Sequence, residues 1–147
     1  MYEQLSNDVN RVIKRANSIA REYEQEYVGT EHVLLAIAQG ENDSGARILK
    51  DHGLTMDKIK AEVDKLVKAS MEDTWVFGRL PGTPHYRNVV AMAIEEARKL
   101  SGKEVRTEHL LLALLSEKGC VAQKALTGLG LTQGAVREEI KSRTPAP

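Results

Sequence analysis

The amino-acid sequence predicts an all-α protein of eight helices, organised as two pseudo-two-fold-related repeats of four helices each. The main observation is an internal duplication: TEHVLLA at residues 30–36 returns as TEHLLLA at residues 107–113, a shift of 107 − 30 = 77 residues. The same register relates the Gly-Leu-Thr of residues 53–55 to that of residues 130–132. Aromatic residues make up only 4% of the chain, so the core must consist of aliphatic side chains. A duplication this regular indicates two copies of one structural unit.

The first predicted repeat spans residues 1–70. Ser6 and Thr30 suit helix N-cap positions, because a hydroxyl can accept a hydrogen bond from a backbone amide two or three residues on. Gly53 suits a left-handed C-cap, and Thr55 precedes a new helix. Between these signals, apolar residues recur at helical spacing. The four helices are expected to follow Ser6, to run from 31 to about 39, from about 43 to 51, and from 56 to near 70.

The second predicted repeat spans residues 83–143 and follows the same plan. Thr83 and Pro84 form a cap followed by proline at the first helical position, where the missing N–H has no intrahelical partner to lose. Thr107 is expected to cap the sixth helix, and Gly130 is expected to end the seventh. The eighth helix then follows Thr132.

Residues 71–82 form the predicted linker between the repeats, and they contain Trp75 and Phe77, the chain's single Trp and single Phe. Two interpretations are open. These side chains pin the linker onto the bundle, because aromatic side chains bury a large area. Alternatively, they form an exposed apolar contact for a partner. Residues 144–147 (TPAP) cannot continue a helix and are expected to begin a flexible tether.

Composition excludes several classes of partner. The chain carries 21 basic and 21 acidic residues, so no net field attracts a polyanion or an anionic membrane, and we expect no nucleic-acid or membrane partner. Cys120 is the single cysteine, which rules out an internal disulfide and fits a reducing compartment such as the cytoplasm. The first ten residues do not have the pattern of a signal peptide.

Catalytic signatures are missing from the sequence. There is no G-x-x-x-x-G-K-[ST] phosphate loop, no G-x-S-x-G elbow and no H-E-x-x-H. The four histidines and one cysteine form no zinc-ligand set. We therefore expect no enzyme activity, no metal and no cofactor. The remote alternative is a small hydrolase that uses Glu31 or Glu108 with a histidine, and it would require a concave site with shifted titration.

The repeated Thr-Glu-His has two interpretations. In the structural one, Thr30 and Thr107 cap their own helices, and Glu31 and Glu108 favour the positive end of the helix dipole in the first turn. In the functional one, the helix start offers amides to an anion while the neighbouring carboxylate binds a guanidinium. An arginine phosphorylated on its guanidinium would satisfy both groups at once.

The doubled V-[GR]-T-E-H-[VL]-L-L, the Gly-Leu-Thr after each third helix and the GRLPGTP of residues 78–84 resemble the Clp N-terminal domain, closest to the ClpC/ClpA type of AAA+ unfoldase. The resemblance covers residues 5 to about 143. It implies an eight-helix, non-catalytic chaperone domain that docks adaptor proteins and captures protein clients for an ATPase ring and the ClpP peptidase. It also implies phosphoarginine binding at Thr30, Glu31, Thr107 and Glu108. The alternative within this fold is a free-standing regulator that binds a Clp complex.

Two departures from the family pattern affect these expectations. Arg106 stands where the family usually has glycine, and its guanidinium either pairs with Glu108, in the place of a ligand arginine, or adds a contact for an anion. Gly82 stands where the family tends to have an aromatic residue, which predicts a shallower apolar groove. The groove residues would be Tyr2, Leu5, Val9 and Tyr86, of which Val9 and Tyr86 could equally belong to the core. In isolation the chain is expected to be monomeric, because the ATPase rings form the family's hexamers.

Overall fold

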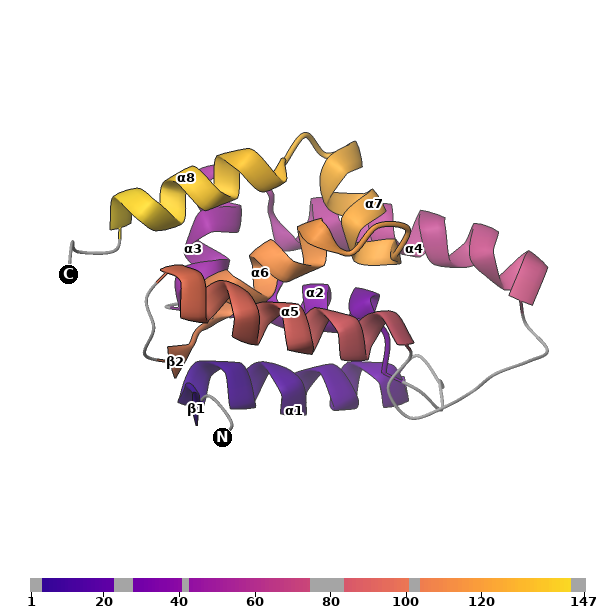
Figure 1. The fold of residues 1–147 in the computed structure, drawn as a ribbon. Helices are drawn as coiled ribbons and strands as arrows, with labels where there is room; N and C mark the ends of the chain where they lie inside the picture. The colour runs from indigo at the N-terminus through magenta and orange to yellow at the C-terminus, as the bar shows by residue number, and fades with distance from the viewer. Residues whose placement is uncertain (1–3, 23–27, 41–42, 75–83, 101–103, 144–147) are drawn as a thin grey trace.

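The computed structural model describes residues 4–22, 28–40, 43–74, 84–100 and 104–143 (Figure 1). Tyr2, Trp75, Phe77, Thr83 and the predicted tether lie outside the described residues. The described residues form eight helices and two short strands: β1 (Gln4–Leu5), α1 (Asn7–Glu22), α2 (Thr30–Ala38), α3 (Ser44–Asp51), α4 (Met56–Thr74), α5 (Pro84–Leu100), β2 (Glu104–Val105), α6 (Thr107–Ser116), α7 (Val121–Gly128) and α8 (Gln133–Arg143).

The helix starts reproduce the register of the sequence duplication. From α1 to α5 the shift is 84 − 7 = 77, from α2 to α6 it is 107 − 30 = 77, from α3 to α7 it is 121 − 44 = 77, and from α4 to α8 it is 133 − 56 = 77. The predicted all-α fold of two four-helix repeats is confirmed. Each element therefore has a counterpart whose surroundings can be compared residue by residue.

The second helix of each repeat lies at the centre of the fold. Residues 30–37 of α2 and 107–115 of α6 are all buried. A helix that is apolar on every side can be stable only inside a core. α2 packs on α1, α3, α4, α6 and α7, and α6 packs on α3, α5, α7 and α8, so that both lie among the other helices (Figure 1). One hydrophobic cluster draws on both repeats, so neither repeat has a separate core.

Several predicted boundaries are confirmed. Ser6 caps α1, its Oγ accepting a hydrogen bond from the Val9 N–H at 3.2 Å. Gly53 and Gly130 follow α3 and α7 with φ values of 76° and 94°, in the left-handed region where a side chain is strained. α4 is longer than expected, since it continues past residue 70 to Thr74.

The predicted caps of the central helices were wrong. Thr30 and Thr107 are the first helical residues, and the N-cap residues are Gly29 and Arg106, neither of which makes a side-chain cap bond. The sequence pattern correctly indicated a threonine hydroxyl at the N-terminus of each helix, but the threonine is one residue past the N-cap position. These threonines therefore have other partners, described below.

A two-stranded parallel pairing was not expected from the sequence. Gln4 pairs with Glu104 and Leu5 with Val105, and the Ser6 N–H donates to the Val105 carbonyl at 2.9 Å. Strands of two residues are too short to show an apolar alternation. This pairing holds the start of α1 beside the start of α6, and so joins the repeats. None of the described helices is long and apolar enough to cross a membrane.

Candidate functional site

Each Thr-Glu-His motif begins a central helix, and all of its side chains are buried. Glu31 is 6% exposed and Glu108 is 8% exposed, and the threonines and histidines beside them are even less exposed. Carboxylates are almost never buried to this degree unless they are paired. The partners of each residue therefore decide between the structural and the functional interpretation.

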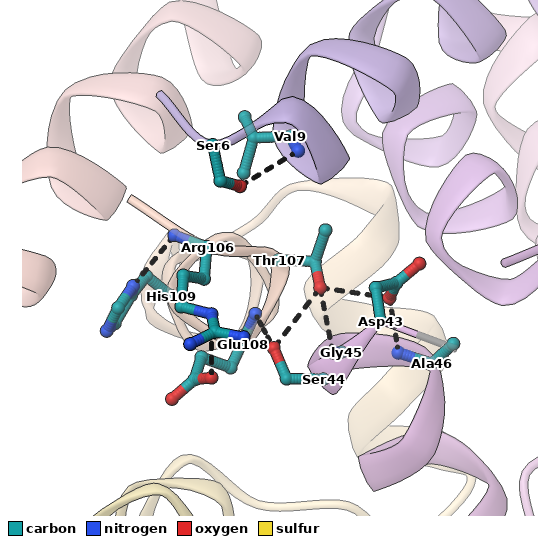
Figure 2. Close-up of polar contacts among 10 residues, drawn as sticks. All are labelled: Ser6, Val9, Asp43, Ser44, Gly45, Ala46, Arg106, Thr107, Glu108 and His109. Atoms are coloured by element: carbon teal, nitrogen blue, oxygen red, sulfur yellow. Dashed lines mark hydrogen bonds and ion pairs between the residues drawn. The ribbon is translucent and has the colours of Figure 1, made fainter. Parts of the chain in front are cut away.

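Thr107 makes its hydrogen bonds with the other repeat. Its Oγ1 accepts from the Gly45 N–H at 2.8 Å and donates to Asp43 Oδ1 at 2.9 Å (Figure 2). Asp43 is the N-cap of α3, where its carboxylate also accepts from the Ala46 N–H at 2.9 Å. The Thr107 hydroxyl thus completes the cap of a helix in the first repeat rather than the cap of its own helix.

Thr30 makes the corresponding contacts from the first repeat to the second. Its Oγ1 accepts from the Ala122 N–H, at a longer 3.3 Å, and its hydroxyl also hydrogen-bonds the Cys120 sulfur. Cys120 is the N-cap of α7, where its Sγ accepts from the Gln123 N–H at 3.3 Å. It occupies the repeat position of Asp43, since 43 + 77 = 120. Burial raises the pKa of its thiol. Cys120 is therefore a buried structural thiol.

The difference in length between the two threonine bonds has a steric explanation. A Cβ atom added to Gly45 would lie 2.9 Å from the Thr107 carbonyl oxygen, closer than such contacts permit. Glycine thus lets α3 approach the start of α6 closely. Ala122, the counterpart in α7, carries a Cβ, and its amide accordingly lies farther from Thr30.

The two histidines hydrogen-bond the N-caps of their own helices. His32 Nδ1 accepts from the Gly29 N–H at 2.8 Å, and His109 Nδ1 accepts from the Arg106 N–H at 3.0 Å. A side chain at the third helical position that binds the N-cap amide is half of a capping box. Burial lowers the pKa of His32 to about 4 and also lowers that of His109. The basic nitrogen of each neutral ring is thus occupied, which leaves neither motif histidine free to act as the general base of a hydrolase.

Glu31 lacks an equivalent structural partner. Its carboxylate lies against Gly29 and hydrogen-bonds its own backbone N–H. Among the described residues, no Lys or Arg forms an ion pair with it. Burial raises the pKa of the Glu31 carboxyl, while its own amide and the nearby His85 act in the opposite direction. Such a carboxylate is suited to a cation that comes from outside the domain.

Glu108 has two partners. Its backbone N–H donates to Ser44 Oγ at 3.2 Å, and its Oε1 lies 3.9 Å from Arg106 Nε (Figure 2). The Arg106 guanidinium therefore takes the internal pairing that the sequence left open. The two copies of the motif thus differ in charge: among the described residues, Glu31 has no Lys or Arg paired with it, whereas Glu108 has Arg106.

A polar cluster that sequence reasoning missed lies where α5 begins and α6 ends. His85 Nδ1 lies 2.6 Å from Glu117 Oε2, and Asn88 Nδ2 donates to the same oxygen at 2.9 Å. Burial alone raises the pKa of Glu117, but the hydrogen bonds from Asn88 and His85 outweigh it, and the pKa is lowered. No sequence spacing relates these residues to the motif.

The predicted groove residues are only partly described. Val9 is a core residue, 1% exposed, and Tyr86 is half-buried and packs against the core. Leu5 lies in β1, and Tyr2 lies outside the described residues. The groove stays a prediction. Among the described residues, no group of three His, Cys, Asp or Glu side chains could hold a metal ion.

Comparison with known proteins identifies the family. The family model of the Clp repeat (R) N-terminal domain matches residues 4–77 and 82–146, so the chain belongs to this family. It is 34% identical over 140 residues to a Clp protease ATP-binding subunit ClpA homolog of Cyanidium caldarium, covering 95% of this chain and 16% of that protein.

A further relative and a solved structure support the same family assignment. The chloroplastic chaperone protein ClpC2 of Oryza sativa is 31% identical over 140 residues, 95% of this chain and 15% of that protein. The crystal structure of the N-terminal domain of the Arabidopsis thaliana chaperone ClpD superposes with a TM-score of 0.76 at 19% identity, covering 97% of this chain and 96% of that one. The fold is thus a double Clp-N repeat related to the ClpA, ClpC and ClpD N-terminal domains. The chain spans about a sixth of the curated relatives' length.

Removing the two threonine hydroxyls tests the reciprocal caps. Thr107→Val keeps the side-chain shape but removes the hydrogen bonds with the Gly45 amide and with Asp43, and we expect it to lower the free energy of unfolding by about 1–3 kcal/mol. Thr30→Val breaks a longer bond and should cost less. Urea unfolding of both variants measures the difference. A larger effect of Thr30→Val would contradict this account.

The titration of His32 predicts acid destabilisation. The unfolded chain binds a proton on His32 near pH 6.5, whereas the native state binds it only at about pH 4. As the pH falls through this window, the free energy of unfolding should therefore decrease, by about 3 kcal/mol at 1.36 kcal/mol per pKa unit.

The matched variant is His32→Gln, which keeps an acceptor for the Gly29 amide but does not titrate. Urea unfolding between pH 4 and 7 should give a shallower pH slope for this variant than for the wild type. Equal slopes would show that His32 does not titrate differently in the two states.

Proposed function

We propose that this chain is the client- and adaptor-binding domain of a Clp-type AAA+ unfoldase, and that its Glu31 pocket binds a guanidinium-bearing side chain, phosphoarginine in particular. The observation that carries the proposal is the Glu31 carboxylate, which is buried, has a raised pKa and forms no ion pair among the described residues. A ligand cation supplies what the carboxylate lacks.

The surroundings of Glu31 suit the phosphoryl group as well. The carboxylate lies at the start of α2, the positive end of a helix dipole, which favours an anion beside the guanidinium. His85 lies close enough for its charge to act on Glu31, and a protonated imidazole would attract the phosphoryl group. Plain arginine would use only the carboxylate, and phosphoserine only the anion contacts. A ligand with both groups should therefore bind best.

The mechanism follows from the domain's place in its relatives. The named relatives include ATP-binding subunits of Clp proteases, and this chain matches about a sixth of their length. The unfolding work, the ATPase ring and the passage of clients to ClpP would belong to other segments or chains. Capture of a client by this domain raises the client's effective concentration at the ring. The domain itself is non-catalytic, monomeric in isolation and cytoplasmic in this proposal.

An NMR titration of the labelled chain with a phosphoarginine peptide tests the proposal, with arginine and phosphoserine peptides as controls. Selective shifts should appear at residues 30 and 31. Glu31→Gln should weaken binding by about 1.5–3 kcal/mol, roughly 10- to 150-fold, the range for a hydrogen bond to a charged group. The melting temperature should not fall, because burial disfavours the charge that this substitution removes.

Glu108→Gln is the matched control, since it makes the same change in the other repeat. It should leave the affinity nearly unchanged. A large loss of stability in Glu31→Gln with unaltered binding would instead assign Glu31 a structural role. No selective shifts with any peptide would move the function to adaptor docking elsewhere on the domain.

A further inference from the structure

The two N-cap residues have the same backbone conformation but different side chains. Gly29 has φ −110° and ψ 175°, and Arg106 has φ −113° and ψ 170°. Neither conformation requires glycine. The residue type at this position therefore acts through the space and the charge of its side chain, and not through the path of the backbone.

Beside Glu31, the glycine at position 29 leaves room for the carboxylate. A Cβ atom added to Gly29 would lie 2.4 Å from Glu31 Oε1, which no real contact allows. At the second pocket that Cβ is present, on Arg106. Glu108 therefore cannot adopt the arrangement that Glu31 has, although the helix beneath it starts in the same way.

The rest of the Arg106 side chain supplies a cation. Its Nε lies 3.9 Å from Glu108 Oε1, with the Arg106 side chain 54% exposed and that of Glu108 10% exposed (Figure 2). The Glu108 N–H is also engaged, by Ser44 Oγ. The first repeat's pocket lacks this second constraint, because the counterpart of Ser44 is Val121 (44 + 77 = 121), which has no hydroxyl.

We propose that Arg106 is a built-in occupant that closes the second pocket to guanidinium ligands, so that the domain binds one phosphoarginine-type ligand, at Glu31, and not two. This inference rests on the proposed function of the Glu31 pocket. A guanidinium tethered two residues from Glu108 competes at an effective concentration that a free ligand cannot match. Its charge also repels the guanidinium of an incoming ligand. Arg106 is thus a specificity-determining residue.

Calorimetric titration of the whole chain with the phosphoarginine peptide, read together with NMR shifts, tests this. The wild type should bind one equivalent, and Glu31→Gln should bind roughly 10- to 150-fold more weakly. Adding Arg106→Gly to Glu31→Gln should restore one site, with shifts at residues 107 and 108 and an affinity within about tenfold of the wild type. Glycine is the residue that α2 already has at this position, so the helix start should be retained.

Two further variants keep the test specific to charge. Arg106→Ala in the Glu31→Gln background removes the guanidinium and keeps the Cβ, and it should recover part of the binding. Arg106→Lys keeps a cation and should recover none. Melting curves establish that each variant is folded. Recovery in the Lys variant equal to that in the Gly variant would overturn the inference.

The outcomes separate this inference from the proposed function. Two equivalents bound by the wild type, with shifts at both motifs, would overturn the role of Arg106 while leaving the Glu31 pocket standing. The same holds if the wild type binds one equivalent and the Glu31→Gln, Arg106→Gly variant remains silent. Binding by neither the wild type nor the Arg106→Gly variant would contradict the proposed function itself, and this inference with it.

Discussion

The hydrogen bonds of the two threonine hydroxyls hold this fold together at its centre. Thr107 binds the start of α3 and Thr30 binds the start of α7, each across the boundary between repeats. A helix start leaves backbone amides that must find partners when buried. Here the partner for each third helix comes from the other repeat's central helix. The repeats are therefore incomplete alone, which agrees with the single core that they share.

Each candidate site likewise draws on residues of both repeats. Glu108 belongs to the second repeat, yet its amide is held by Ser44 of the first. Glu31 belongs to the first, and the charge of His85 of the second acts on it. A ligand at either carboxylate would thus contact the boundary between the repeats. Its binding should depend on an intact pair of repeats and not on one motif.

The sequence predicted the helices well because the 77-residue shift and the apolar periodicity are local signals. It misplaced the caps, since the pattern of a hydroxyl at a helix start does not tell whether the hydroxyl serves its own helix or another one. Thr30 and Thr107 are first helical residues, and only the packing of α2 against α7 and of α6 against α3 supplies their partners. The β1–β2 pair and the polar cluster of His85, Asn88 and Glu117 likewise depend on contacts between segments distant in sequence. Arg106 is visible in the sequence as a departure from the family's glycine, but only the structure shows that its guanidinium pairs with Glu108.

Duplication of Thr-Glu-His does not by itself indicate two binding sites. In both copies, the threonine is explained by the cap that it gives the other repeat, and the histidine by the N-cap amide of its own helix. Both roles are structural and involve no ligand. The glutamates differ in their ion pairs: among the described residues Glu31 pairs with no Lys or Arg, whereas Glu108 lies beside Arg106. In the proposed function the carboxylate is the binding group, and the residue before each threonine, Gly29 or Arg106, determines what lies beside it.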